Sequence, residues 1–121
     1  DRIDRVNLLI DEMRRKLEQK AFANAELYYN LRQYQSAIQS FDNLLKDFPE
    51  TLEAEKVRYL IVKSNYLLAD NSVLDKRAER FRDTIEAYEN FVKKYPNSSF
   101  RKELDKIMDS VTIKLKELED V

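Results

Sequence analysis

An internal repeat constrains the fold of this chain more strongly than any other feature of its sequence. When the sequence is shifted by 47 residues, a segment that ends at Pro49 overlays a segment that ends at Pro96. The apolar positions coincide: Tyr34 meets Phe81, Ile38 meets Ile85, Phe41 meets Tyr88, Leu44 meets Phe91, Leu45 meets Val92 and Phe48 meets Tyr95. Their spacing is that of one face of an α-helix. A fixed period of this size is typical of proteins built from stacked helical repeats.

The segments that precede these two helices are related by a different shift. Tyr28 meets Tyr66 when the chain is moved by 38 residues. We assign the difference to an insertion over residues 71–80, between the two helices of the second unit. The sequence therefore predicts a single domain over residues 1–121, with repeat units over about 17–49 and 52–96 and a terminal helix over 99–118.

The composition favours helices throughout. The chain has no Gly and only two Pro among its 121 residues, so it offers few sites for β-hairpin turns. Apolar periodicity predicts a long first helix over about 1–31, then helices over about 34–48, 52–69, 76–95 and 99–118. Thr51 and Ser98 are expected N-caps, and Ser72 with Asp75 fits a capping box. The predicted fold class is an all-α solenoid of about five helices.

The repeat units match the tetratricopeptide pattern W-x2-L-G-x2-Y…A-x3-F…P. The first unit places Tyr28, Ala37, Phe41 and Pro49 at the last four positions of this pattern, and the second places Tyr66, Thr84, Tyr88 and Pro96 there. The small residue lets two antiparallel helices approach, and Pro ends the second helix. We expect the aromatic members to lie in the solenoid core. The Gly position holds Ala25 in one unit and Lys63 in the other.

Several classes of chemistry are excluded by residues that the chain lacks. It contains no His, Cys, Gly or Trp, which excludes a Ser-His-Asp triad, a thiolate nucleophile, a zinc finger and a glycine-rich phosphate loop. Paired carboxylates such as Asp105 and Asp109 occur at helical spacing, which is typical of a solvated surface. We expect no enzyme activity, no cofactor and no metal; an all-α enzyme that uses carboxylates or lysines is the alternative.

The charge pattern does not favour nucleic-acid binding. The 22 basic and 23 acidic residues give a net charge of −1, and the basic clusters are interleaved with acids. No apolar run approaches the length of about 20 residues that a membrane span needs. The sequence begins at Asp1 without a signal-peptide pattern. We therefore expect a fragment of a longer protein from which any targeting segment is absent.

Five short motifs resemble one known family. They are Ala25-Glu26-Leu27-Tyr28-Tyr29-Asn30, Tyr34-Gln35-Ser36-Ala37-Ile38, Leu44-Leu45-Lys46-Asp47-Phe48-Pro49, Ala69-Asp70-Asn71-Ser72 and Ala87-Tyr88-Glu89-Asn90-Phe91. With the long first helix, they resemble the C-terminal repeats of the BamD-like lipoproteins of outer-membrane β-barrel assembly, in the form found in Bacteroidetes-type bacteria. The family's N-terminal repeats and lipid-modified Cys have no counterpart in this sequence.

The resemblance implies a non-enzymatic scaffold on the periplasmic face of the outer membrane. Its partners would be the periplasmic domains of a BamA-like barrel subunit and accessory lipoproteins, and its contact with the membrane would be only through the absent N-terminal lipid anchor. The alternative is a tetratricopeptide co-chaperone or regulatory adaptor from another compartment.

Two surfaces are candidates for docking a partner. The outward face of the second helix carries mostly amides in a highly charged chain: Gln35, Gln39, Asp42, Asn43 and Lys46. Interfaces disfavour Lys and Glu, so this composition suits docking, with plain solvent exposure as the alternative. The insertion, with Lys76 and Arg77, is the second candidate, because insertions in repeat proteins map to one face.

Further contact residues are expected outside these surfaces. Tyr29 and Phe100 lie off the strict repeat stripe, which makes them candidates for exposed anchors. Phe22 and Glu26 stand where carboxylate-clamp repeats need Lys and Asn, so capture of a C-terminal carboxylate is disfavoured. The first helix carries an apolar stripe of Ile3, Val6, Leu9, Ile10 and Met13. We interpret it as a packing seam and expect self-association through it.

Overall fold

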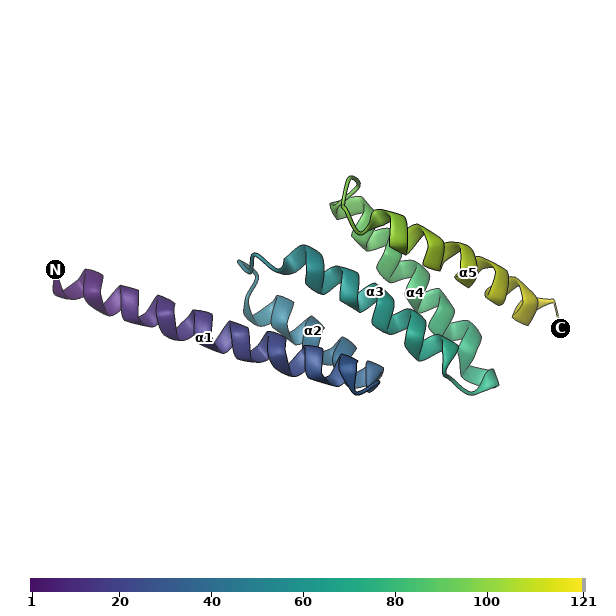
Figure 1. The fold of residues 1–121 in the computed structure, drawn as a ribbon, viewed down its shortest axis with the longest axis horizontal. Helices are drawn as coiled ribbons and strands as arrows, with labels where there is room; N and C mark the ends of the chain where they lie inside the picture. The colour runs from purple at the N-terminus through teal and green to yellow at the C-terminus, as the bar shows by residue number, and fades with distance from the viewer. Residues whose placement is uncertain (121) are drawn as a thin grey trace.

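A computed structural model describes residues 1–120 and shows five α-helices (Figure 1). They are α1 (Arg2–Asn30), α2 (Tyr34–Asp47), α3 (Ala54–Asp70), α4 (Leu74–Lys94) and α5 (Arg101–Glu119). The described part of the chain contains no strand. The predicted all-α fold with a long first helix is confirmed, and the helix bounds agree to within a few residues.

Short connections make neighbouring helices pack side by side and antiparallel. The contacts follow chain order, α1 with α2, α2 with α3, α3 with α4 and α4 with α5, and α5 also reaches back to α3. Between α1 and α2 the chain turns at Arg32, which adopts a positive φ of 62°, a conformation that favours Gly. The result is a row of helices in which each one meets only its near neighbours.

The two expected N-caps were wrong, because the residues at the starts of α3 and α5 are Glu53 and Phe100 and neither start has a side-chain cap. The Thr51 hydroxyl accepts a hydrogen bond from the Glu53 N–H, and the Ser98 hydroxyl accepts one from the Phe100 N–H (both 3.1 Å). Both bonds hold the turn before a helix. The capping box was wrong, because the Ser72 hydroxyl donates back to the Leu68 carbonyl and α4 begins only at Leu74.

Two apolar clusters hold the helices together. The larger draws residues from all five helices, and its fully buried members include Ala25, Ala37, Phe41, Val57 and Leu104. The smaller joins α3, α4 and α5 through Ala69, Phe81 and Val111. Burial of these side chains supplies the main stabilisation of the fold.

The repeat-motif residues differ in burial. Ala37, Phe41 and Thr84 are fully buried. Tyr66 and Tyr88 are half-buried, and their hydroxyls bond to Ser110 and Asp105 on α5. Pro49 and Pro96 are exposed and stand just beyond the ends of α2 and α4. The expectation that Tyr28 lies in the core was wrong, because this residue is 38% exposed. The neighbouring face of α1, rather than the one that carries Tyr28, packs on α2.

The segment 71–80 is mostly helical. Because α4 begins at Leu74, most of this segment forms the first turns of a helix that is 21 residues long, whereas α2 has 14. The extra length lies at the N-terminal end of α4, beyond the part that matches α2.

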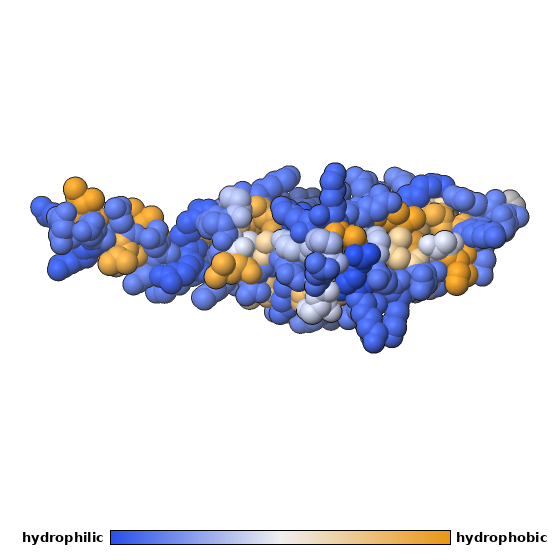
Figure 2. Space-filling model, turned by 90° about the horizontal axis from the view of Figure 1, so that it is seen from above, coloured by the Kyte–Doolittle hydropathy of each residue, from blue (hydrophilic) through white to orange (hydrophobic). Residues whose placement is uncertain are grey.

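The N-terminal half of α1 projects beyond the rest of the molecule (Figure 1). Residues 1–17 are all exposed. Figure 2 shows apolar side chains at the surface of this projecting end. The apolar side chains of this end are not buried against any other part of the described chain.

Candidate docking surfaces

The outward face of α2 is a polar surface. Gln35, Gln39, Asn43 and Lys46 are exposed, as their spacing suggested. The Gln39 side-chain amide donates to the Asn43 amide oxygen at 3.1 Å, which orders two neighbouring amides on one face. Such a surface offers donors and acceptors without a large charge to desolvate.

Asp42 differs from the other residues of this face, because it is half-buried and lines a cleft between α2, α3 and α4. The cleft has a volume of about 290 Å³. Burial raises the pKa of Asp42, and burial together with Glu79 and Glu86 raises the pKa of Asp83 on the opposite wall. The Arg58 Nε atom beside them is buried without a hydrogen-bond partner. Sequence reasoning missed Arg58 and Asp83, because three helices must meet to form the cleft.

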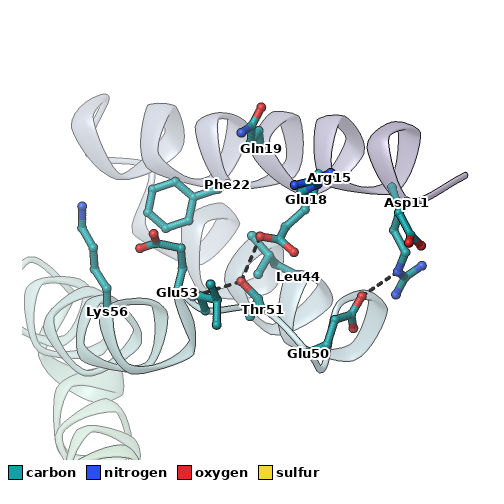
Figure 3. Close-up of a pocket in the computed structure, with 12 residues that line it drawn as sticks. Asp11, Arg15, Glu18, Gln19, Phe22, Leu44, Glu50, Thr51, Glu53 and Lys56 are labelled. Carbon is teal, nitrogen blue, oxygen red and sulfur yellow. Dashed lines mark hydrogen bonds and ion pairs between the residues drawn. The ribbon is translucent and has the colours of Figure 1, made fainter. Parts of the chain in front are cut away.

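A second groove lies between α1 and the segment that joins α2 to α3 (Figure 3). Its volume is about 710 Å³. Phe22 and Leu44 provide apolar lining, and Leu52 at the rim is 99% exposed.

One close ion pair and several hydrogen bonds cross this groove. Arg14 donates to Glu50 at 2.6 Å and to the Asp47 carbonyl at 2.5 Å, while Thr51 donates to Glu18 at 3.1 Å. Lys56 lies 3.8 Å from Glu26 in α1. These contacts tie α1 to the α2–α3 segment. They leave few uncompensated cations for a peptide carboxylate.

The two expected aromatic anchors are not exposed. Tyr29 is half-buried against the larger cluster and makes an edge contact with Tyr34 at 5.7 Å. Phe100 is half-buried and stacks on Tyr59, with ring centroids 4.1 Å apart. The expected full exposure of both rings was wrong for one reason: a position off the repeat stripe can still face a neighbouring helix.

The basic residues of the insertion have different environments. Arg77 donates to the Ser72 carbonyl at 3.3 Å and to the Asp70 carbonyl at 3.4 Å, so it satisfies carbonyls at the end of α3. Lys76 is exposed. Of this pair, Lys76 is the better placed to meet a partner.

A polar network attaches α5 to α3, and no spacing pattern along the chain predicted it. The Tyr59 hydroxyl donates to Glu103 at 2.7 Å, and Lys63 lies 3.1 Å from the same carboxylate. Lys63 also lies over the rings of Tyr29 and Tyr59. Burial lowers the pKa of Lys63, but hydrogen bonds to Tyr59 and Glu103 outweigh it, so the pKa lies above its ordinary value. Lys63 occupies the position where the repeat pattern has Gly, and its side chain contacts residues of α1, α3 and α5.

We expect this network to make folding sensitive to acid. Burial raises the pKa of Glu103, but hydrogen bonds from Tyr59 and Lys63 lower it by more, so the pKa lies below its ordinary value. The hydrogen bond from the Tyr88 hydroxyl lowers the pKa of Asp105. A carboxyl whose pKa is depressed by folding stabilises the fold above its unfolded pKa, and this stabilisation is lost as the pH falls through the folded pKa. Asp42 and Asp83, whose pKa values are raised in the fold, have the opposite effect on stability, because their protonated forms lose less on desolvation. The melting temperature should therefore change little down to about pH 4 and fall below it.

Circular-dichroism melts across this pH range measure the effect. The double variant Glu103→Gln with Asp105→Asn removes two of the three carboxyls whose pKa is lowered in the fold, Glu50 being the third, and should make the acid limb less steep. An acid limb as steep in the variant as in the parent would contradict the assignment.

The described residues contain no group of three or more acids that could hold a metal ion. None of the helices seen in the structure combines the length and the apolar character that a bilayer crossing demands.

Comparison with known proteins adds one match. The family described as YfiO, outer membrane lipoprotein, matches residues 10–119. No curated protein matches the chain at a significant level. The matched range includes α2 to α5 completely and most of α1.

Proposed function

This chain belongs to the YfiO outer membrane lipoprotein family, which is BamD-like, and on that premise we propose that it is a non-enzymatic docking scaffold. It would act in the assembly of outer-membrane β-barrels, as the C-terminal repeats of a longer lipoprotein of the Bacteroidetes type. Its place would be the periplasmic face of the outer membrane, held there by an N-terminal lipid. Its partners would be the periplasmic domains of a BamA-like subunit and accessory lipoproteins.

The observation that carries the proposal is the family match over residues 10–119. The residues themselves support it, because the described chain consists of packed helices whose polar side chains bond to one another rather than converging on a reaction centre. The groove between α1 and the α2–α3 segment is crossed by the Arg14–Glu50 ion pair and by the hydrogen bond from Thr51 to Glu18. These features suit a binding module.

We propose that the outward face of α2 is the surface that docks the BamA-like domains. Its exposed residues are Gln35, Gln39, Asn43 and Lys46, with Asp42 at the edge of the neighbouring cleft. Interface cores are depleted of charged residues, and this amide-rich strip has few. Lys76 at the start of α4 would extend the contact.

The double variant Gln39→Glu with Asn43→Glu should weaken binding of the cognate BamA-like periplasmic domains by about tenfold, because two charges would lose water on binding without a partner charge. Isothermal titration calorimetry measures the change. The matched control, Asn97→Glu with Ser99→Glu, adds the same charge to exposed positions between α4 and α5 and should bind as the parent does. Loss of affinity in both variants would indicate a general charge effect and contradict the assignment. Absence of binding by the parent would contradict the proposed function.

A further inference from the structure

The cleft between α2, α3 and α4 combines apolar lining with an excess of negative charge. Its volume is about 290 Å³, and its apolar lining includes Ile38, Ile61 and Phe91, one from each helix. Its charged lining consists of three carboxylates and one guanidinium: Asp42, Asp83, Glu86 and Arg58. A hollow that joins apolar lining with a few convergent polar groups is the usual form of a binding site.

The three carboxylates of the cleft have no bonded partner within the described chain. Carboxylates that join helices elsewhere have a cation close by: Asp70, Glu103 and Glu119 each lie between 2.7 and 3.1 Å from a Lys or Arg nitrogen. No ion pair of the described residues includes a carboxylate of the cleft. The cleft therefore differs from the other polar contacts between helices, which are complete within the chain.

Neighbouring cations compensate these carboxylates only in part. Lys46 and Arg58 lower the pKa of Asp42, but burial raises it by more. Arg80 lowers the pKa of Asp83, but burial and two neighbouring acids raise it by more. A carboxylate that loses water without gaining a cation is costly, so both side chains are suited to receive a positive charge from a ligand.

The environment of Arg58 narrows the class of ligand further. Its Nε atom is buried and has no hydrogen-bond partner, so the cleft lacks an acceptor as well as a cation. A metal ion or a simple ammonium ion offers no acceptor. A basic residue of a polypeptide brings a cation and a main-chain carbonyl together, and it can therefore satisfy groups of both kinds.

We propose that the cleft receives an arginine side chain of the partner polypeptide. The aliphatic stem would lie on Ile38 and Ile61, and the guanidinium, which can donate to more than one carboxylate at once, would lie between Asp42 and Asp83. The main-chain carbonyl of the same residue would accept from Arg58. The cleft borders the outward face of α2, so the proposal rests on the proposed function for the identity of the partner. The chemistry of the site follows from its lining alone.

Two blocked tripeptides test this chemistry. One has arginine between two alanines, and the other has citrulline, the uncharged isostere of arginine, in its place. In NMR titrations of the whole chain, the arginine peptide should shift the backbone amides around Asp42 and Asp83 and saturate at millimolar concentration. Its affinity should exceed that of the citrulline peptide by at least about tenfold. Equal affinity of the two peptides, or no saturation by about 50 mM, would overturn the proposal.

Variants of the chain locate the binding. Asp42→Asn with Asp83→Asn should abolish the shifts and keep the fold, because neutral side chains avoid the cost of desolvating two carboxylates. The matched control, Asp109→Asn with Glu117→Gln, removes the same charge from exposed positions of α5 and should bind as the parent does. Binding that survives in the first variant, or that is lost equally in the control, would overturn the proposal.

Calorimetry with the BamA-like periplasmic domains separates this proposal from the proposed function. The variant Asp42→Asn with Asp83→Asn should bind these domains about tenfold more weakly, because the guanidinium of the partner would lose water without gaining a carboxylate. Binding as tight as that of the parent would overturn the proposal and leave the proposed function standing. If the parent itself does not bind the domains, the proposed function fails, and the peptide titrations alone decide whether the cleft takes arginine.

Discussion

Replacing Phe41 with alanine should lower the free energy of unfolding by about 3–5 kcal/mol. Phe41 lies on α2, is fully buried, and meets Phe22 of α1 edge-on with ring centroids 6.2 Å apart. It belongs to the cluster that includes residues of every helix, so its loss leaves a cavity that no single helix can fill by shifting. The cost combines the lost burial of the ring with the remaining cavity.

Urea unfolding followed by circular dichroism measures this change. Leu52→Ala is the matched control, because Leu52 is also apolar but is 99% exposed, and it should change stability by less than about 0.5 kcal/mol. A cost below about 1 kcal/mol for Phe41→Ala would mean that the site collapses around the smaller residue and that α2 does not organise the cluster. A changed slope with denaturant would instead indicate loss of two-state unfolding.

The fold was largely predictable because its information is local and repeated. Apolar spacing gave five helices, and the match between segments ending at Pro49 and Pro96 gave the relation between α2 and α4. The capping box at Ser72 failed because capping depends on where the helix begins: α4 begins two residues later, and the Ser72 hydroxyl bonds to α3 instead.

Burial along α1 was not predictable from periodicity alone. An apolar stripe shows that a face is suited to burial, but not which element covers it. On α1, α2 packs on the face where Ala25 is fully buried and Tyr29 half-buried, and Tyr28 lies beside this face. This is why the expected core residue Tyr28 is exposed and the expected anchor Tyr29 is half-buried.

The candidate docking face was predictable in part. Exposure of Gln35, Gln39, Asn43 and Lys46 follows from their position opposite the apolar stripe of one helix. The half-buried position of Asp42 does not, because the cleft that it lines is completed by Arg58 of α3 and Asp83 of α4. Contacts such as that between Tyr59 and Glu103 join residues 44 positions apart, and no spacing within one helix encodes them.

Replacing Phe100 with alanine should cost about 2 kcal/mol and act mainly on α5. Phe100 is half-buried and stacks on Tyr59 at 4.1 Å, with ring planes within 11° of parallel, immediately before α5 begins. The ring also borders the Tyr59–Glu103 hydrogen bond, so its removal admits water to the network that holds α5 on α3. A terminal helix that packs only on α3 and α4 can open without disrupting the hairpin of α1 and α2.

Native-state hydrogen exchange separates this local effect from a global one. In the Phe100→Ala variant, the amides of α5 should lose more protection than those of α2, because the ring lies immediately before α5 and stacks on Tyr59 of α3. Ile113→Ala removes an exposed apolar side chain from the same helix, 60% exposed, and should leave protection unchanged. Phe100→Leu should restore part of the loss, since an aliphatic side chain regains burial but not stacking. Equal loss of protection in α2 and α5 would show instead that the five helices unfold as one cooperative unit.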